Sequence, residues 1–71
     1  MMTVAEARAS MAYIVRRGTE PRQVVVDVTI GDKTYPYSDL LTRRRTTSDI
    51  IRVACHAGLN RWIDEREGVQ A

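Results

Sequence analysis

Arginine and hydroxyl side chains are concentrated in one short stretch of the sequence, from Arg43 to Arg52. Guanidinium groups suit bidentate contact with phosphate, and the free backbone N–H groups at a helix start also bind anions. The candidate phosphate ligands in this stretch are Arg43, Arg44, Arg45, Thr46, Thr47, Ser48 and Arg52. Arginine, serine, threonine and backbone N–H groups are the usual donors to DNA phosphates. The stretch therefore predicts a binding site for the DNA backbone.

A simpler interpretation of the same stretch stays open. Threonine and serine are also the residue types that cap helix N-termini, so Thr46 to Ser48 could serve the helix alone. The arginine run would then be a solvated flank. Ten of the eleven basic residues are arginine, with Lys33 as the exception, and a GC-rich genome would also produce this bias.

Patterns for catalysis or metal binding are missing from the sequence. His56 and Cys55 are the single histidine and the single cysteine, and neighbouring helical residues point to different faces. The helical neighbours of His56 at three and four positions are Arg52, Val53, Leu59 and Asn60. None of these is a nucleophile that a histidine could activate. We therefore expect no enzymatic activity, no metal and no cofactor.

The elements that position the arginines begin with an N-terminal helix. Thr3 and Glu6 have the spacing of a capping box, and apolar residues recur behind them with a helical period. Gly18 and Pro21 are typical of a helix end. We predict a helix over Thr3–Arg17.

The apolar period changes to two between Val24 and Ile30, which predicts a strand with one buried face. Gly31-Asp32 is a two-residue turn signal, so Thr34–Tyr37 is predicted to return as a second strand. Pro36 confines that strand to a sheet edge. A helix over residues 31–38 is the alternative that the sequence leaves open.

A second helix is predicted to begin between Thr46 and Asp49. Its apolar stripe consists of Ile51, Ala54, Cys55, Gly58, Leu59 and Trp62. Val53 and Ile63 lie on the opposite, polar face, and a helix that is apolar on two sides is typical of burial by a partner. We predict self-association as a homodimer, with local packing on the hairpin as the alternative. The predicted interface residues are Val53, Gly58, Trp62 and Ile63.

These patterns predict one small α+β domain over residues 1–71, in the order α-β-β-α, with two helices packed on a β-hairpin. Residues 66–71 are predicted to be frayed. A chain of 71 residues is near the lower size limit for folding alone. No apolar run approaches the roughly 18 residues of a membrane span. With no signal-peptide pattern and one free thiol, we expect no membrane association and a cytoplasmic location.

The stretch RRRTTSDIIRVACHAGLNRWI resembles the second helix of ribbon-helix-helix regulators, with its basic flank and Thr/Ser-rich turn. The matching residues are Ser48, Asp49, Ile50, Ile51, Arg52 and Ala54. The resemblance implies a dimer whose paired strands enter the DNA major groove while the region of Thr47 and Ser48 clamps phosphate. It also implies an alternative fold, a ribbon-helix-helix dimer with an extra N-terminal helix.

Two further resemblances concern other parts of the chain. The N-terminal stretch is similar to the opening of Phd/YefM antitoxins, at Glu6, Ala7, Arg8 and Ala9. The helix–hairpin–helix order resembles small phage head–tail joining proteins of the lambda W type. We expect a non-catalytic DNA-binding regulator of antitoxin or repressor type. The alternative is a small phage- or plasmid-borne protein that acts by contact with a host or phage protein, as a virion component or an inhibitor of a host system.

Overall fold

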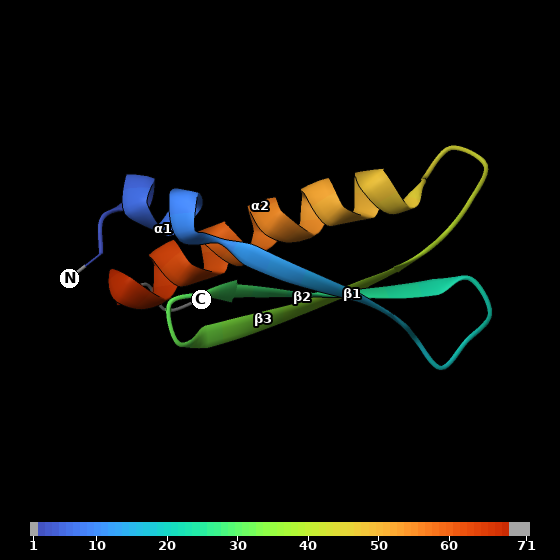
Figure 1. Ribbon diagram of the computed structural model, residues 1–71, viewed down its shortest axis with the longest axis horizontal. Helices are drawn as coiled ribbons and strands as arrows, with labels where there is room; N and C mark the ends of the chain where they lie inside the picture. Colours follow the sequence, from blue (N-terminus) through green and yellow to red (C-terminus); the bar gives the residue numbers. More distant parts are fainter. Residues whose placement is uncertain (1, 69–71) are drawn as a thin grey trace.

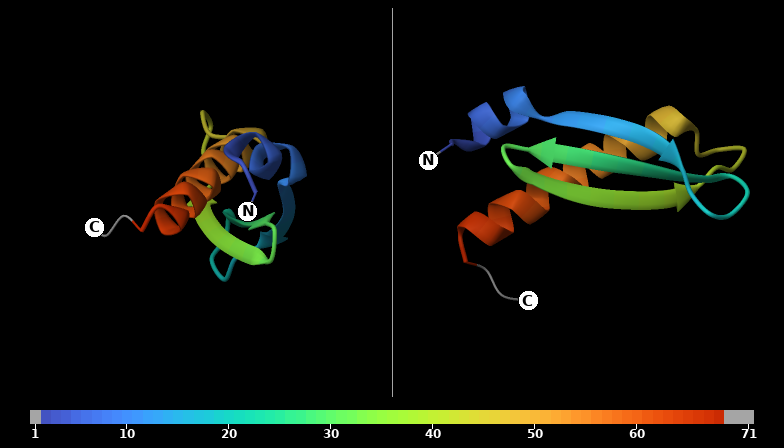
Figure 2. Two further views of the ribbon diagram at one scale, coloured as in Figure 1. Left: turned by 90° about the vertical axis from the view of Figure 1, so that its left-hand side faces the viewer. Right: turned by 60° about the horizontal axis from the view of Figure 1, so that its bottom comes forward.

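A computed structural model describes residues 2–68 as a three-stranded antiparallel sheet with one long and one short helix. The elements are α1 (Val4–Ser10), β1 (Ala12–Arg17), β2 (Gln23–Ile30), β3 (Lys33–Leu40) and α2 (Thr47–Arg66). β2 is the central strand, and α2 runs along one face of the sheet (Figures 1 and 2). The predicted α+β class is confirmed. The predicted fraying at 66–71 falls in part on residues 69–71, which lie outside the described residues.

The first helix is shorter than the sequence predicted. Its capping box forms: the Glu6 N–H donates to Thr3 Oγ1 (3.1 Å), and the Thr3 N–H donates to Glu6 Oε1 (2.9 Å). The helix nevertheless ends at Ser10. The predicted helix over Thr3–Arg17 is therefore wrong in its second half.

The segment after α1 joins the sheet as β1, so the expected hairpin becomes a three-stranded sheet. β1 pairs with β2 from Ala12 opposite Thr29 to Arg17 opposite Val24. Its aromatic and β-branched residues suit a strand. A two-stranded hairpin is marginal in water, and a third strand stabilises it. Pairing with β2 thus decides the structure of a segment whose apolar spacing also fits a helix.

The core lies between the sheet and α2. Val24, Val26, Val28 and Ile30 are all buried, as the alternation in β2 predicted, but Val25 on the opposite face is buried as well. From the helix, the buried residues are Ile50, Ala54, Gly58 and Leu59. α2 therefore covers the β2 and β3 side of the sheet with its apolar stripe. None of the helices formed by the described residues is long and apolar enough to cross a lipid bilayer.

The hairpin between β2 and β3 forms at the predicted turn. Ile30 pairs with Lys33, and Gly31 has a φ of +65°, which glycine adopts at little cost. Residues 31–38 are thus turn and strand. The alternative ribbon-helix-helix layout requires a helix where β3 lies, and it does not fit this structure.

Pro36 lies on the outer edge of β3, as predicted. The Leu41 N–H donates to the Arg22 carbonyl (2.8 Å), one residue beyond the β2–β3 pairing and in the same register. Backbone groups that face the partner strand alternate with groups that point away from it, so this bond shows which residues of β3 face β2. The backbone groups at Pro36 therefore point away from β2. Proline has no N–H, so no ladder hydrogen bond is lost there.

Tyr35 joins β3 to the C-terminal half of α2. It is only 3% exposed, and its hydroxyl donates to Glu65 Oε1 (2.8 Å). The Arg61 guanidinium lies over the ring, 5.2 Å from its centroid. Burial and the hydrogen bond to Glu65 raise the pKa of Tyr35 to about 12.

The raised pKa predicts a loss of stability at high pH. Because the folded pKa of Tyr35 exceeds the ordinary value of 10, its stabilising contribution is complete below pH 10 and is lost as the pH rises towards about 12. We expect the free energy of unfolding in urea to fall over this range in the wild type and to fall less in Tyr35→Phe. Equal slopes in the two proteins would contradict the assignment.

Candidate nucleic-acid interface

The three consecutive arginines lie in the loop of residues 41–46 that joins β3 to α2. Thr42 organises this loop. Its hydroxyl accepts from the N–H groups of Arg44 (3.3 Å) and Arg45 (3.0 Å), and its own N–H donates to the Arg45 carbonyl (3.1 Å). The three arginines are exposed. They project from a loop whose backbone is held by hydrogen bonds.

Arg45 differs from the two arginines before it, because its guanidinium forms an ion pair with Asp39. The Leu40 N–H and the Arg45 guanidinium hold the pKa of the Asp39 carboxyl below its ordinary value. In the part of the chain that the structure describes, the guanidinium groups of Arg43 and Arg44 make no hydrogen bond or ion pair. Only these two of the predicted run are free to bind a ligand without breaking an existing contact.

α2 begins with a capping box of its own. Thr46 Oγ1 accepts from the Asp49 N–H (3.3 Å), and Asp49 Oδ2 accepts from both the N–H and the hydroxyl of Thr46 (3.0 Å each). The hydroxyl of Thr46 is therefore already engaged, and the carboxylate of Asp49 occupies the positive end of the helix dipole. Thr47 and Ser48 remain exposed in the first turn.

Arg52 is placed apart from the arginine run. It forms an exposed ion pair with Asp49 (3.7 Å), and it lines a shallow groove between α1 and α2 together with Arg8 and His56. Cys55 lies in the same groove and packs against the core, and burial raises the pKa of its thiol. Cys55 thus belongs to the apolar stripe predicted for α2 and is partly buried against the core.

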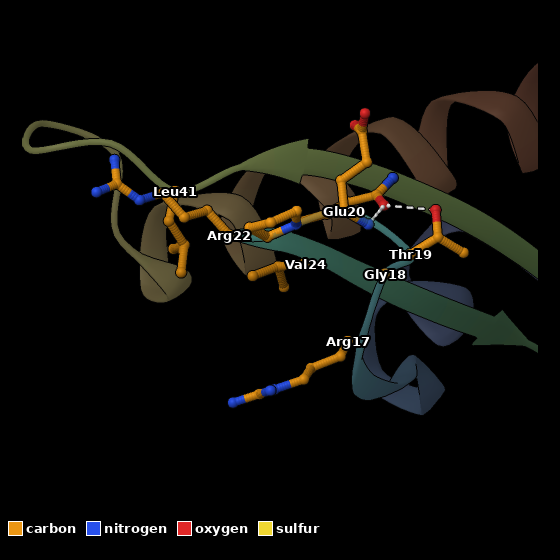
Figure 3. A pocket seen from close by; sticks show the side chains of 9 residues that line it. Arg17, Gly18, Thr19, Glu20, Arg22, Val24 and Leu41 are labelled. Carbon is orange, nitrogen blue, oxygen red and sulfur yellow. Dashed lines mark hydrogen bonds between the residues drawn. The ribbon is translucent and has the colours of Figure 1, made fainter.

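The structure brings two further arginines to the arginine run. The turn of residues 18–22, between β1 and β2, lies beside the 41–46 loop, and the two are joined by the hydrogen bond from the Leu41 N–H to the Arg22 carbonyl. Arg22 and Arg43 line one small groove at this end, and Arg17 and Arg22 line a larger one. Figure 3 shows the side chains of Arg17 and Arg22 extending away from the strands, with Val24 between them. The sequence predicted neither residue as part of the site. A helix over Thr3–Arg17 would not bring Arg17 and the following turn beside the 41–46 loop.

Arg22 has a backbone conformation that favours glycine. Its φ is +66°, in a turn closed by hydrogen bonds from the Gly18 N–H to the Gln23 carbonyl (3.0 Å) and from the Gln23 N–H to the Glu20 carbonyl (3.1 Å). A left-handed conformation costs a residue with a side chain about 1–2 kcal/mol. Strain of this kind is concentrated at functional sites.

Positive charge is unevenly distributed over the molecule. One end of the molecule is formed by the 18–22 turn, the 41–46 loop and the adjoining ends of the strands and of α2 (Figure 1). The basic residues at this end are Arg16, Arg17, Arg22, Arg43, Arg44 and Arg45, and the acidic residues are Glu20, Asp39 and Asp49. The opposite end carries both signs in similar number, with Glu6, Asp32, Asp64, Glu65 and Glu67 against Arg8, Lys33, Arg61 and Arg66. We call Arg17, Arg22, Arg43 and Arg44 the arginine end. Within residues 2–68, none of these four guanidinium groups has an ion pair.

The predicted interface on α2 divides into buried and exposed parts. Gly58 packs inside the chain, because a Cβ built on it would lie 3.1 Å from Val28 Cγ1. This supports local packing on the sheet as the reason for a glycine at this position. Trp62 and Ile63 are half-buried against the core, and the Arg66 guanidinium lies 4.8 Å from the Trp62 ring centroid. Of the four predicted residues only Val53 is well exposed, at 45%.

Comparison with protein-family models, with curated proteins and with solved structures gives no match. Function can therefore be inferred only from the chemistry of the molecule itself. Among residues 2–68, no three histidine, cysteine or acidic side chains are grouped so that they could hold a metal ion. The arginine end is the site with the most distinctive chemistry.

Proposed function

We propose that this protein is a non-catalytic, cytoplasmic DNA-binding regulator of antitoxin or repressor type that grips duplex phosphates with its arginine end. One observation carries the proposal: four arginines without ion pairs lie at one end of the molecule, three of them on two loops that are hydrogen-bonded to each other and Arg17 at the end of β1. Arg22 shares one groove with Arg17 and another with Arg43. Guanidinium groups are suited to bidentate contact with phosphate. Separate loops presenting them at one end would span successive phosphates along a strand.

Neighbouring groups support the same role. The Arg45–Asp39 ion pair leaves Arg45 tied to the protein, so Arg43 and Arg44 carry the contact from this loop. The exposed hydroxyl groups of Thr47 and Ser48 would add hydrogen bonds to phosphate oxygens. Contacts of this kind set the position of a protein on a duplex and do not read the base sequence.

The test is fluorescence anisotropy with random-sequence duplex DNA titrated with salt. We expect the logarithm of the binding constant to fall linearly with the logarithm of salt concentration. The slope for Arg43→Ala/Arg44→Ala should be shallower by about 2, because each phosphate contact contributes about 0.9. The matched control is Arg8→Ala/Arg61→Ala, which removes the same charge outside the arginine end and should leave the slope unchanged.

Three outcomes would contradict the proposal. Absence of binding at low salt would remove DNA as the ligand. Equal effects of the two double variants would indicate general charge attraction without a site. Tighter binding of duplex RNA or of single strands than of duplex DNA would retain the arginine end and reject the assignment to DNA.

Arg22→Gly separates binding from folding in the same experiment. Glycine relieves the left-handed strain at Arg22 but gains freedom in the unfolded chain, so the free energy of unfolding should stay within about 1 kcal/mol of wild type. The salt slope should become shallower by about 1. A stable Arg22→Gly variant with an unchanged slope would remove Arg22 from the site.

A second candidate function is that of a small phage- or plasmid-borne protein that acts by contact with another protein. The observation that favours it is the exposure of three consecutive apolar residues of β1, Tyr13, Ile14 and Val15, at 50%, 68% and 41%. In that case the arginine end would meet an acidic protein surface. The DNA titration distinguishes the two, because this candidate requires no affinity for random-sequence duplex.

A further inference from the structure

β1 forms one edge of the sheet, and its outer side is uncovered. The strand order is β1-β2-β3, and all six residues of β1 are exposed. Tyr13, Ile14 and Val15 stand next to one another in this strand and account for much of the exposed apolar surface of large side chains. The right-hand view of Figure 2 shows β1 as the outer strand, with α2 behind the sheet. An uncovered apolar edge is a ready template for pairing with another strand.

The free hydrogen-bonding groups along this edge can be assigned from the pairing. The Gly18 N–H donates to the Gln23 carbonyl (3.0 Å), in register with the β1–β2 ladder. Inward and outward directions alternate along an antiparallel strand. The backbone groups of Tyr13, Val15 and Arg17 therefore point outward, away from β2.

The two edges of the sheet differ in how they are protected. β3 carries Pro36 in the middle of its outward-pointing groups, which removes an N–H that a further strand would need. β1 contains no proline, and its charges are confined to its last two residues. Of these two, Arg16 is already bound across the sheet to Asp27 (2.8 Å). β3 is thus blocked as a pairing edge, whereas β1 is open over its whole length.

We propose that β1 pairs antiparallel with β1 of a second copy of this chain, which joins the two sheets into one six-stranded sheet. The arrangement centred on Val15 places Val15 opposite Val15 of the second copy and Tyr13 opposite Arg17 of the second copy. Every outward backbone group of the three residues then has a partner. We propose this surface in place of the predicted interface on α2, because Gly58 already packs against Val28 of β2 in the same chain.

A second copy fits this edge because the strand is complementary to itself. Antiparallel pairing about a two-fold axis places the charged half of one strand beside the apolar half of the other. The free guanidinium of Arg17 meets the Tyr13 ring of the other copy, and a cation over an aromatic ring is attractive. Like charges are thereby kept apart, whereas parallel pairing would bring the arginines together.

The first test is the molar mass in solution without nucleic acid, measured by sedimentation equilibrium. We expect a species of twice the 8.1 kDa chain mass. Val15→Lys places a charge at the centre of the edge and should weaken the dimer at least about tenfold. Val53→Lys is the matched control, because Val53 is exposed to a similar extent on α2, and its dimer should be unchanged.

Val15→Pro copies on β1 the protection that Pro36 provides on β3. The Val15 N–H points outward, so the proline removes no bond to β2, and the circular dichroism spectrum should keep its native form. The variant should be monomeric. Two results would overturn the proposal. The first is a wild-type protein that is monomeric at all concentrations. The second is a dimer that is lost in Val53→Lys and kept in Val15→Lys.

Amide hydrogen exchange locates the interface directly. The amide protons of Tyr13, Val15 and Arg17 should exchange slowly at concentrations where the dimer forms and rapidly after dilution. The Ile14 amide points towards β2 and should be protected under both conditions, as an internal control. A dimer in which these three amides exchange rapidly would place the interface elsewhere and reject the β1 pairing.

Discussion

A Gly58→Leu variant is expected to lose the native packing of α2 on the sheet. The Cβ of any residue at this position would lie 3.1 Å from Val28 Cγ1 and 3.2 Å from Val28 Cβ, already closer than ordinary contact. The remaining atoms of leucine would have to occupy the space of the buried Val28 side chain. Overpacking a core costs about 1–3 kcal/mol and sometimes more. A domain of 71 residues has little stability in reserve.

Urea denaturation followed by circular dichroism measures this effect. Asn60→Leu is the control, because Asn60 is exposed on the same helix and the same side chain should be tolerated there. Gly58→Ala should change stability little, because the tight contact opposes a gain of about 1 kcal/mol in helix propensity. A stably folded Gly58→Leu protein would show that the helix does not approach β2 this closely.

An Ile50→Ala variant is expected to lose about 2–5 kcal/mol of unfolding free energy. Ile50 is completely buried, and α2 contributes it to the core one turn after the Thr46 cap. The loss combines the transfer of the removed methyl groups to water with the cavity that they leave. Folded domains are stable by only about 5–15 kcal/mol, so this one side chain accounts for a large part of the total.

Val53→Ala provides the comparison within the same helix. Val53 is 45% exposed, so its truncation should change the free energy of unfolding by about 0.5 kcal/mol or less. Both variants are measured by urea denaturation with the slope of the transition held common. Similar losses at the two positions would mean that Val53 is covered in solution, which would restore α2 as an interface.

The sequence predicted those elements whose signals are local. The strand β2, the Gly31-Asp32 turn and the Thr46 region at the start of α2 each depend on neighbouring residues, and all three are present. β1 could not be predicted in this way. Its apolar spacing also fits a helix, and pairing with β2, whose partner residues lie 7 to 17 positions further along the chain, decides the outcome.

The same limit applies to the arginine end. Arg43 and Arg44 were found because they are adjacent in the sequence, and the structure places both on the surface. Arg17 and Arg22 join them only because β1 is a strand that turns back at this end of the sheet. A helix over Thr3–Arg17 conceals that proximity. The error in one element thus accounts for the two missing residues of the candidate site.

The hydrogen bond from the Leu41 N–H to the Arg22 carbonyl has an entropic consequence. It ties the bases of the two arginine-bearing loops together, so the spacing between the loops is set before any ligand arrives. A ligand that bridges them does not have to order the two backbones relative to each other, and less conformational entropy is lost on binding. The sheet thereby holds the two loops in a fixed relative position, through a hydrogen bond one residue beyond the end of β3.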